Sequence, residues 1–123
     1  MKALIFENPD DHGCSLADCF SKLFRENGIE SEIFRSGSEA YLSLITGEFD
    51  LVLIHHAYFD IVDFFRLRNP NIKYIGYSTE LVRDDSIKKG TLADAFRKEM
   101  SKHYDRVISD NEIEEFIKSF KKG

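Results

Sequence analysis

The sequence has no apolar segment that approaches the roughly 18 residues needed to cross a bilayer. Its first residues, MKALIF, lead directly into a strand pattern and lack the layout of a signal peptide. Cysteine is scarce, since only Cys14 and Cys19 occur, and a chain of this size folds without disulfides, so both thiols are expected to be reduced. These absences predict a cytoplasmic protein without a membrane segment.

The sequence also lacks an excess of basic residues. It has 22 acidic and 17 basic residues and a net charge of -5, whereas a nucleic-acid-binding domain is expected to carry a basic patch or stripe. The densest basic stretch, residues 118–122, lies at the end of a predicted helix, where positive charge complements the helix dipole. The composition therefore argues against nucleic acid as a partner.

Length and hydrophobic content indicate a single domain over residues 1–123, because 123 residues with 42% hydrophobic content suit one globular core. Strand and helix patterns alternate along it. Strands are predicted at residues 2–7, 29–35, 51–54, 72–77 and 106–108. Helices with apolar residues at intervals of three and four are predicted to begin near Ser15, Ser38, Asp60, Thr91 and Asp110 or Asn111.

This alternation predicts the fold class. The first two helices are expected to end at Gly28 and Gly47, and the third before Pro70. Parallel crossovers are right-handed, and helices must cover both faces of a parallel sheet. The prediction is an α/β protein with a flavodoxin-like three-layer α/β/α sandwich and a five-stranded parallel sheet of order 2-1-3-4-5.

The segment FDLVLIHH, residues 49–56, indicates where a site would lie. Its four apolar residues behind Asp50 predict a strand that is covered on both faces. Ligands of open α/β sheets bind beyond the carboxyl ends of such strands, which is where His55 and His56 fall. Because neighbouring residues of a strand point to opposite faces, the two histidines are not expected to chelate one ion together.

Over essentially its whole length the chain resembles the response-regulator receiver domain of two-component signalling. The resemblance rests on the segments ALIFEN (3–8), GEFDLVLIHH (47–56), YIGYST (74–79) and YDRVISDN (104–111). It implies that the family's functional positions fall, in chain order, on Glu7 and Asn8 for the metal-binding acids, His55 for the phosphoacceptor aspartate, Ser78 for the hydroxyl residue, Val107 for the aromatic switch and Asp110 for the lysine.

These positions lack the chemistry of aspartyl phosphorylation. That reaction needs a carboxylate nucleophile, a divalent cation and a fixed positive charge on the phosphoryl group. Here His55 replaces the nucleophile and Asp110 reverses the sign of the lysine. The chain is therefore interpreted as a pseudo-receiver, meaning a receiver fold kept as a signalling interaction domain that binds a protein partner or a second copy of itself without catalysis of its own. The polar insert at residues 81–90 lies beside the face through which such domains usually bind partners.

A second interpretation is a metal- or cofactor-binding domain, possibly enzymatic, centred on Glu7, His12 and His55. The donors that could meet at the carboxyl edge of the sheet are Glu7, Asp10, Asp11, His12, His55, Ser78 and Asp110. Mixed histidine and carboxylate ligands suit a divalent cation such as zinc, manganese or iron. No pair among them has the HxxxH or CxxC spacing that makes a metal motif specific.

Three further hypotheses concern the same edge. Asp10 and His12 in DDHGCS resemble part of the DxHxxG segment of cobalamin-binding domains, although Ser15 stands where that segment has glycine. FMN or a dinucleotide is disfavoured because the first turn, ENPDDHG, is acidic and lacks a glycine-rich phosphate loop. Phosphorylation of His55 on nitrogen is weighed against a neutral imidazole that is hydrogen-bonded to Glu7 or Ser78 and fills the site.

Aromatic residues beyond the histidines are the remaining candidates for an interaction surface. Most of the eleven Phe and five Tyr fall on helical stripes or in strands and are expected in the core. Tyr58 and Phe59 follow the histidines in a predicted loop, where an aromatic pair would form an interaction patch or a lid over the site.

Overall fold

The computed structural model describes residues 1–7, 16–47, 49–78, 89–109 and 112–122. Its strands are β1 (Lys2–Phe6), β2 (Glu30–Phe34), β3 (Leu51–His55), β4 (Lys73–Ser78) and β5 (Arg106–Ser109). Its α-helices are α1 (Leu16–Glu26), α2 (Gly37–Thr46), α3 (Phe59–Arg68), α4 (Leu92–Met100) and α5 (Ile113–Lys122), and a 3-10 turn, η1 (His56–Tyr58), joins β3 to α3. Each strand end lies within one residue of the predicted range.

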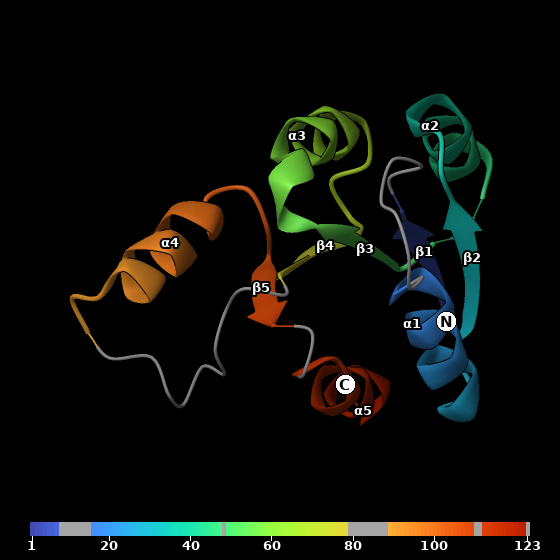
Figure 1. Ribbon diagram of the computed structural model, residues 1–123. Coiled ribbons are helices and arrows are strands. Elements are labelled where there is room, and N and C mark those ends of the chain that lie inside the picture. Colours follow the sequence, from blue (N-terminus) through green and yellow to red (C-terminus); the bar gives the residue numbers. More distant parts are fainter. Residues whose placement is uncertain (8–15, 48, 79–88, 110–111, 123) are drawn as a thin grey trace.

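All described strands belong to one parallel sheet with the order β2-β1-β3-β4-β5. The predicted strand order is therefore confirmed. Helices α2 and α3 lie on one face of the sheet, α1 and α5 lie on the other, and α4 lies beside β5 (Figure 1). This arrangement brings the carboxyl ends of all five strands to one edge of the sheet.

Side chains of the central strand alternate between two cores, one on each face of the sheet. Leu51 and Leu53 pack with α1 and α5, whereas Val52 and Ile54 pack with α2 and α3. All four are fully buried, as expected for a strand that helices cover on both faces. The run of consecutive apolar residues is thus explained by burial on two sides.

Local signals place most of the helix ends. Gly28 adopts the left-handed backbone conformation after α1 (φ 74°), as a helix-ending glycine does, and Thr91 Oγ1 accepts from the Asp94 N–H at the start of α4 (3.3 Å). The predicted start of the second helix at Ser38 is two residues late, because Ser36 is the N-cap and its Oγ accepts from the Glu39 N–H (3.4 Å). Two serines at that boundary are both good capping residues, so the sequence alone does not separate them.

Helix α4 is the most weakly packed of the described helices. None of its described side chains is fully buried, and Leu92 is 90% exposed.

Several predicted positions lie outside the described residues: the caps Ser15, Asp110 and Asn111, the thiol of Cys14, and residues 81–88 of the insert. Cys19, on α1, is a free and exposed thiol. Of the helices in the described ranges, none combines the length and apolar content that a membrane span requires.

Gly76 in β4 has no side chain and therefore leaves space for the ring of Tyr104 to pack against the sheet. A Cβ at residue 76 would meet three atoms of that ring at 3.0–3.1 Å. We expect Gly76→Ala to lower the free energy of unfolding by about 1–3 kcal/mol, because overpacking forces the ring to move. Urea denaturation followed by circular dichroism measures this loss.

Gly37→Ala is the matched control for this substitution. A Cβ at residue 37 meets no heavy atom within 4 Å, and the residue is the first of α2. We expect this variant to be unchanged or stabilised by about 0.5 kcal/mol. Equal stability of the two variants would contradict the packing argument.

Candidate functional site

The carboxyl edge of the sheet brings the predicted site residues into one row. Phe6 of β1 is in register with Phe34 of β2, and Glu7 and Arg35 are the next residues on each strand. His55 ends β3, Ser78 ends β4, and Ser78 is in register with Ser109. Glu7, His55 and Ser78 therefore lie on three adjacent strands, as the resemblance implied. Asn8 and Asp110 lie outside the described residues.

Glu7 is held by a cation from the neighbouring strand. Its Oε2 lies 2.9 Å from Arg35 Nη2 and accepts a hydrogen bond from Arg35 Nε at 3.0 Å. The Glu7 N–H donates to the Phe34 carbonyl (2.9 Å), which fixes the two residues side by side. Glu7 is only 9% exposed, and a buried carboxylate requires such a partner. The one carboxylate that the resemblance assigns to metal binding is thus neutralised by the chain itself.

The predicted orientation of the two histidines, toward opposite faces of the sheet, is wrong. That they do not chelate one ion together stays a prediction. Strand β3 ends at His55, and His56 begins the 3-10 turn η1, so the alternation of a strand no longer applies. The ring centroids of the two imidazoles lie 4.3 Å apart with an interplanar angle of 35°. His56 also meets Phe96 of α4 edge-on at 4.8 Å.

His55 is held as a hydrogen-bond acceptor at one ring nitrogen. Its Nδ1 accepts from the Ala57 N–H (3.2 Å) as the side chain caps η1, and its ring lies edge-on to Tyr77 at 5.5 Å. An accepting Nδ1 carries no proton, so this contact selects the neutral tautomer with the proton on Nε2. Nε2 is then the atom left for the predicted hydrogen bond to Glu7 or Ser78, which stays a prediction.

Tyr104 ties the end of β3 to the loop before β5. Its hydroxyl donates to the carbonyl oxygens of His56 (2.8 Å) and His55 (3.3 Å). The side chain is 2% exposed, and this burial raises the pKa of the hydroxyl well above its usual range. The hydroxyl is therefore a fixed donor at neutral pH, and it holds the backbone at the turn where the two histidines meet.

The other predicted positions are buried at the ends of β4 and β5. Ser78 is 1% exposed and Val107 is 5% exposed. The Val107 carbonyl accepts from Arg97 Nη1 (2.8 Å), and Arg97 Nη2 pairs with Glu112 Oε1 at 2.8 Å. Glu112 Oε1 also accepts from the Ser109 N–H (2.9 Å). A largely buried ion pair thus connects α4 and β5 to the residue that precedes α5.

The expected aromatic pair is only half exposed to solvent. Phe59 is 40% exposed and its ring lies 4.6 Å from that of His103, which pairs with Asp63 at 3.0 Å. Tyr58 is half-buried and packs edge-on against Phe6 at 5.9 Å and against His55 at 6.0 Å. Tyr58 therefore packs at the histidine end of the sheet, whereas Phe59, the first residue of α3, contacts His103 in the segment that follows α4.

The metal interpretation gains no support from the part of the chain that the structure describes. No three His, Cys, Asp or Glu side chains in that part form a group that could hold an ion. Asp10, Asp11, His12 and Asp110 lie outside it, so a divalent cation or cobalamin site that includes them stays a prediction.

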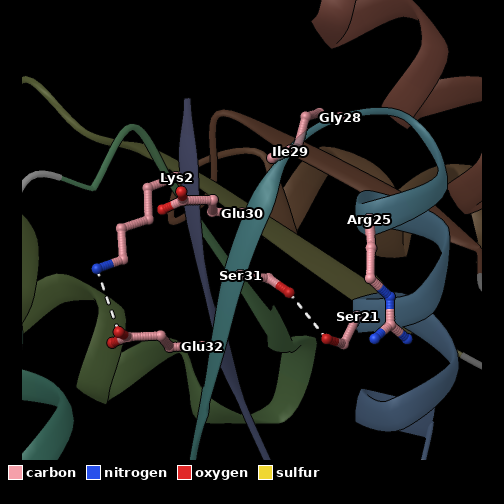
Figure 2. A pocket seen from close by; sticks show the side chains of 8 residues that line it. All are labelled: Lys2, Ser21, Arg25, Gly28, Ile29, Glu30, Ser31 and Glu32. Carbon is pink, nitrogen blue, oxygen red and sulfur yellow. Dashed lines mark hydrogen bonds and ion pairs between the residues drawn. The ribbon is translucent and has the colours of Figure 1, made fainter.

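Two hollows lie away from the carboxyl edge. One, of about 460 Å³, runs between α1 and the edge strand β2 (Figure 2). Figure 2 shows two contacts between polar side chains that line it: Lys2 Nζ pairs with Glu32 (3.1 Å), and Ser21 Oγ lies 2.9 Å from Ser31 Oγ. The other, of about 580 Å³, is lined by Met1, Lys2, Gly28, Glu30 and Asp50, near the amino ends of β1, β2 and β3. Neither hollow includes a predicted site residue.

Comparisons with known proteins agree with this architecture. No protein-family model and no curated protein matches the sequence. The chain is similar in structure to the receiver domain of the Francisella response regulator 1452, with 19% identity and a TM-score of 0.70 over 98% of this chain and 96% of that one. It is also similar to a CheY-like response-regulator receiver domain protein from Methanospirillum hungatei JF-1, with 15% identity and a TM-score of 0.68 over 98% and 93%. The chain therefore has the receiver-domain fold.

Sequence reasoning missed Arg35 and Tyr104. A signal for Arg35 was present, because the predicted order places the first two strands side by side, and Glu7 and Arg35 each follow one of them. Tyr104 gave no such signal, since its hydroxyl contacts carbonyls 48 and 49 residues away. Only the packed fold brings these groups together.

Substitution of Arg35 tests whether the buried Glu7 carboxylate depends on this cation for stability. Arg35→Gln leaves the Glu7 carboxylate buried without its cation, and Arg35 is itself 54% exposed. We therefore expect the free energy of unfolding to fall by about 1–2 kcal/mol, which is less than for a fully buried pair. Glu7→Gln is the matched control, because it removes the charge that needs a partner. A loss for Glu7→Gln as large as that for Arg35→Gln would contradict this account.

Tyr104→Phe tests the hydroxyl at the histidine turn. We expect a loss of about 1–2 kcal/mol at pH 7, because two carbonyls lose their donor. The raised pKa of Tyr104 means that folded and unfolded chains both hold the hydroxyl neutral below about pH 10, so its contribution is fully present there. Above about pH 10 the unfolded chain ionises first, and the contribution is lost. Urea unfolding of both proteins at pH 7 and at alkaline pH should show the gap shrink, and a constant gap would contradict the assignment.

Proposed function

We propose that the protein is a receiver-like signalling domain that acts by binding another protein, without aspartyl phosphorylation and without catalysis of its own. The receiver fold supports a place in signal transduction. The observation that carries the proposal is the pairing at the carboxyl edge, where His55 ends β3 and Arg35 neutralises Glu7.

The first requirement is a carboxylate nucleophile at the end of the central strand. His55 occupies that position, and its Nδ1 accepts from the Ala57 N–H. The interaction selects a neutral ring and engages one of the two nitrogens that would attack phosphorus. An imidazole that caps the turn in this way supports the interpretation that His55 fills the phosphoacceptor position without being phosphorylated.

The second requirement is a divalent cation that neutralises the phosphoryl oxygens. Glu7 is the single carboxylate at the metal-binding positions, and the Arg35 guanidinium already lies 2.9 Å from it. An added dication must compete with this guanidinium and is repelled by its charge. The family's lysine position holds Asp110, so the fixed positive charge for a phosphoryl group is replaced by a negative one.

The proposed partner surface includes α4, β5 and the start of α5, which follow the polar insert in the sequence. Here the largely buried Arg97–Glu112 pair connects α4 to β5 and to the residue before α5. Breaking a buried ion pair costs about 3–5 kcal/mol, so this pair favours a single arrangement of the three elements. We therefore propose a constitutive docking surface.

Incubation with acetyl phosphate and Mg²⁺, followed by intact-protein mass spectrometry, tests this function. We expect no covalent phosphoryl group on the wild-type protein and no change in its tyrosine fluorescence with beryllofluoride and Mg²⁺. A phosphorylatable receiver domain treated in parallel is the positive control.

A stable phosphoryl adduct that His55→Ala abolishes would contradict the proposal and support phosphorylation on histidine. An adduct that survives this substitution would place the acceptor elsewhere and contradict the proposal equally. A His55→Asp variant is expected to remain unphosphorylated as well, because Arg35 still occupies Glu7.

A further inference from the structure

Exposed apolar side chains gather on the helices that cover one face of the sheet. Seven large apolar residues of the described chain are exposed, and five of them belong to α2 or α3: Leu42, Ile45, Phe59, Phe64 and Leu67. The two helices lie next to each other (Figure 1), and Tyr41 of α2 packs on Phe64 of α3 at 5.2 Å. Leu67 is 80% exposed and Leu42 60% exposed. Such a patch is typical of a protein-binding surface.

Charged residues bracket this patch along α3. Asp60, Phe64 and Leu67 are spaced as i, i+4 and i+7, so they form one stripe of the helix. Arg68 lies four residues beyond Phe64, and its guanidinium is 4.1 Å from the centre of that ring. Asp60 and Arg68 are therefore each about 6 Å along the axis from Phe64, on opposite sides of it.

These two charges differ from the other charges of α3. Asp63 pairs with His103, and Arg66 pairs with Asp105. Within the described residues, neither Asp60 nor Arg68 forms an ion pair. The exposed stripe thus carries one acid and one base that have no ion-pair partner in the described part of the chain, and they lie at equal distances along the helix from an exposed aromatic ring.

We propose that a second copy of this chain docks on the α2–α3 face, with the two α3 helices antiparallel and crossing at Phe64. A two-fold axis at Phe64 places Asp60 of each copy opposite Arg68 of the other, as an isologous interface requires. Leu67, Leu42 and Ile45 flank the crossing and lose their exposure to water. This inference rests on the proposed protein-binding function and adds to it a second surface, which binds another copy of the same chain.

The edge strand β2 is the competing surface for a second copy. Antiparallel pairing of two β2 strands brings Glu30 and Glu32 of both copies together at the junction. Like charges on paired strands are destabilising and protect sheet edges from association. The α2–α3 face has complementary charges instead.

The size of the face sets the expected affinity. Each ten-residue helix is about 15 Å long and about 10 Å wide, so the two helices side by side cover about 300 Å². This area is smaller than the roughly 800 Å² that each partner buries in a standard interface. We therefore expect a monomer–dimer equilibrium with a Kd of about 10–500 µM.

Sedimentation equilibrium of the full chain over about 10 µM to 1 mM measures this Kd. Leu67→Glu is expected to raise the Kd at least about tenfold. Cys19→Glu on α1 is the matched control, because Cys19 is exposed and α1 lies on the opposite face of the sheet, and it should change the Kd less than about twofold. Both side chains are exposed, so neither substitution removes core packing.

A charge exchange tests the antiparallel register. Asp60→Arg and Arg68→Asp should each weaken the dimer, and the double variant should bind at least about fivefold more tightly than either single one. A monomer at all concentrations would overturn the inference, as would a dimer that Leu67→Glu leaves intact. Either result leaves the proposed function standing, because that function fails only through the phosphorylation test.

Discussion

The ion pair between Arg35 and Glu7 is the interaction on which the character of the carboxyl edge depends. Neighbouring parallel strands deliver the two residues to the same place, and the Glu7 N–H to Phe34 hydrogen bond fixes their spacing. A buried carboxylate must have a counter-charge. An ion from solvent could be exchanged, whereas a guanidinium on the same chain is present permanently. The counter-charge of the Glu7 carboxylate is thus supplied by the folded chain itself.

The backbone around the two histidines is also fixed by hydrogen bonds within the chain. Strand β3 ends as η1 begins, so the two imidazoles lie together, with His55 capping the turn through Ala57. Tyr104 reaches both histidine carbonyls from the far side of β4, and Gly76 leaves room for its ring. These contacts pair the Tyr104 hydroxyl, both histidine carbonyls and the His55 Nδ1 within the chain.

The fold could be predicted from the sequence because a strand that is buried on both faces has consecutive apolar residues, as at residues 51–54. The candidate site could be predicted only in position. Strand ends locate Glu7, His55 and Ser78, but orientation depends on where a strand stops. Because β3 stops at His55, His56 lies in the 3-10 turn η1, and the two rings come together. The Tyr104 hydroxyl contacts the carbonyls of His55 and His56, which are distant in the sequence, and no local sequence pattern predicts such a contact.

The most direct test of the central claim is whether Mn²⁺ selects the carboxyl edge of the sheet, since a bound paramagnetic ion broadens the NMR signals of nearby amides. The account predicts that Mn²⁺ added to the isotope-labelled wild-type protein will cause no selective loss of the Glu7, His55 and Ser78 amide signals. Selective broadening of these three signals, reversed by excess Mg²⁺, would show that a dication displaces Arg35 and would contradict the account.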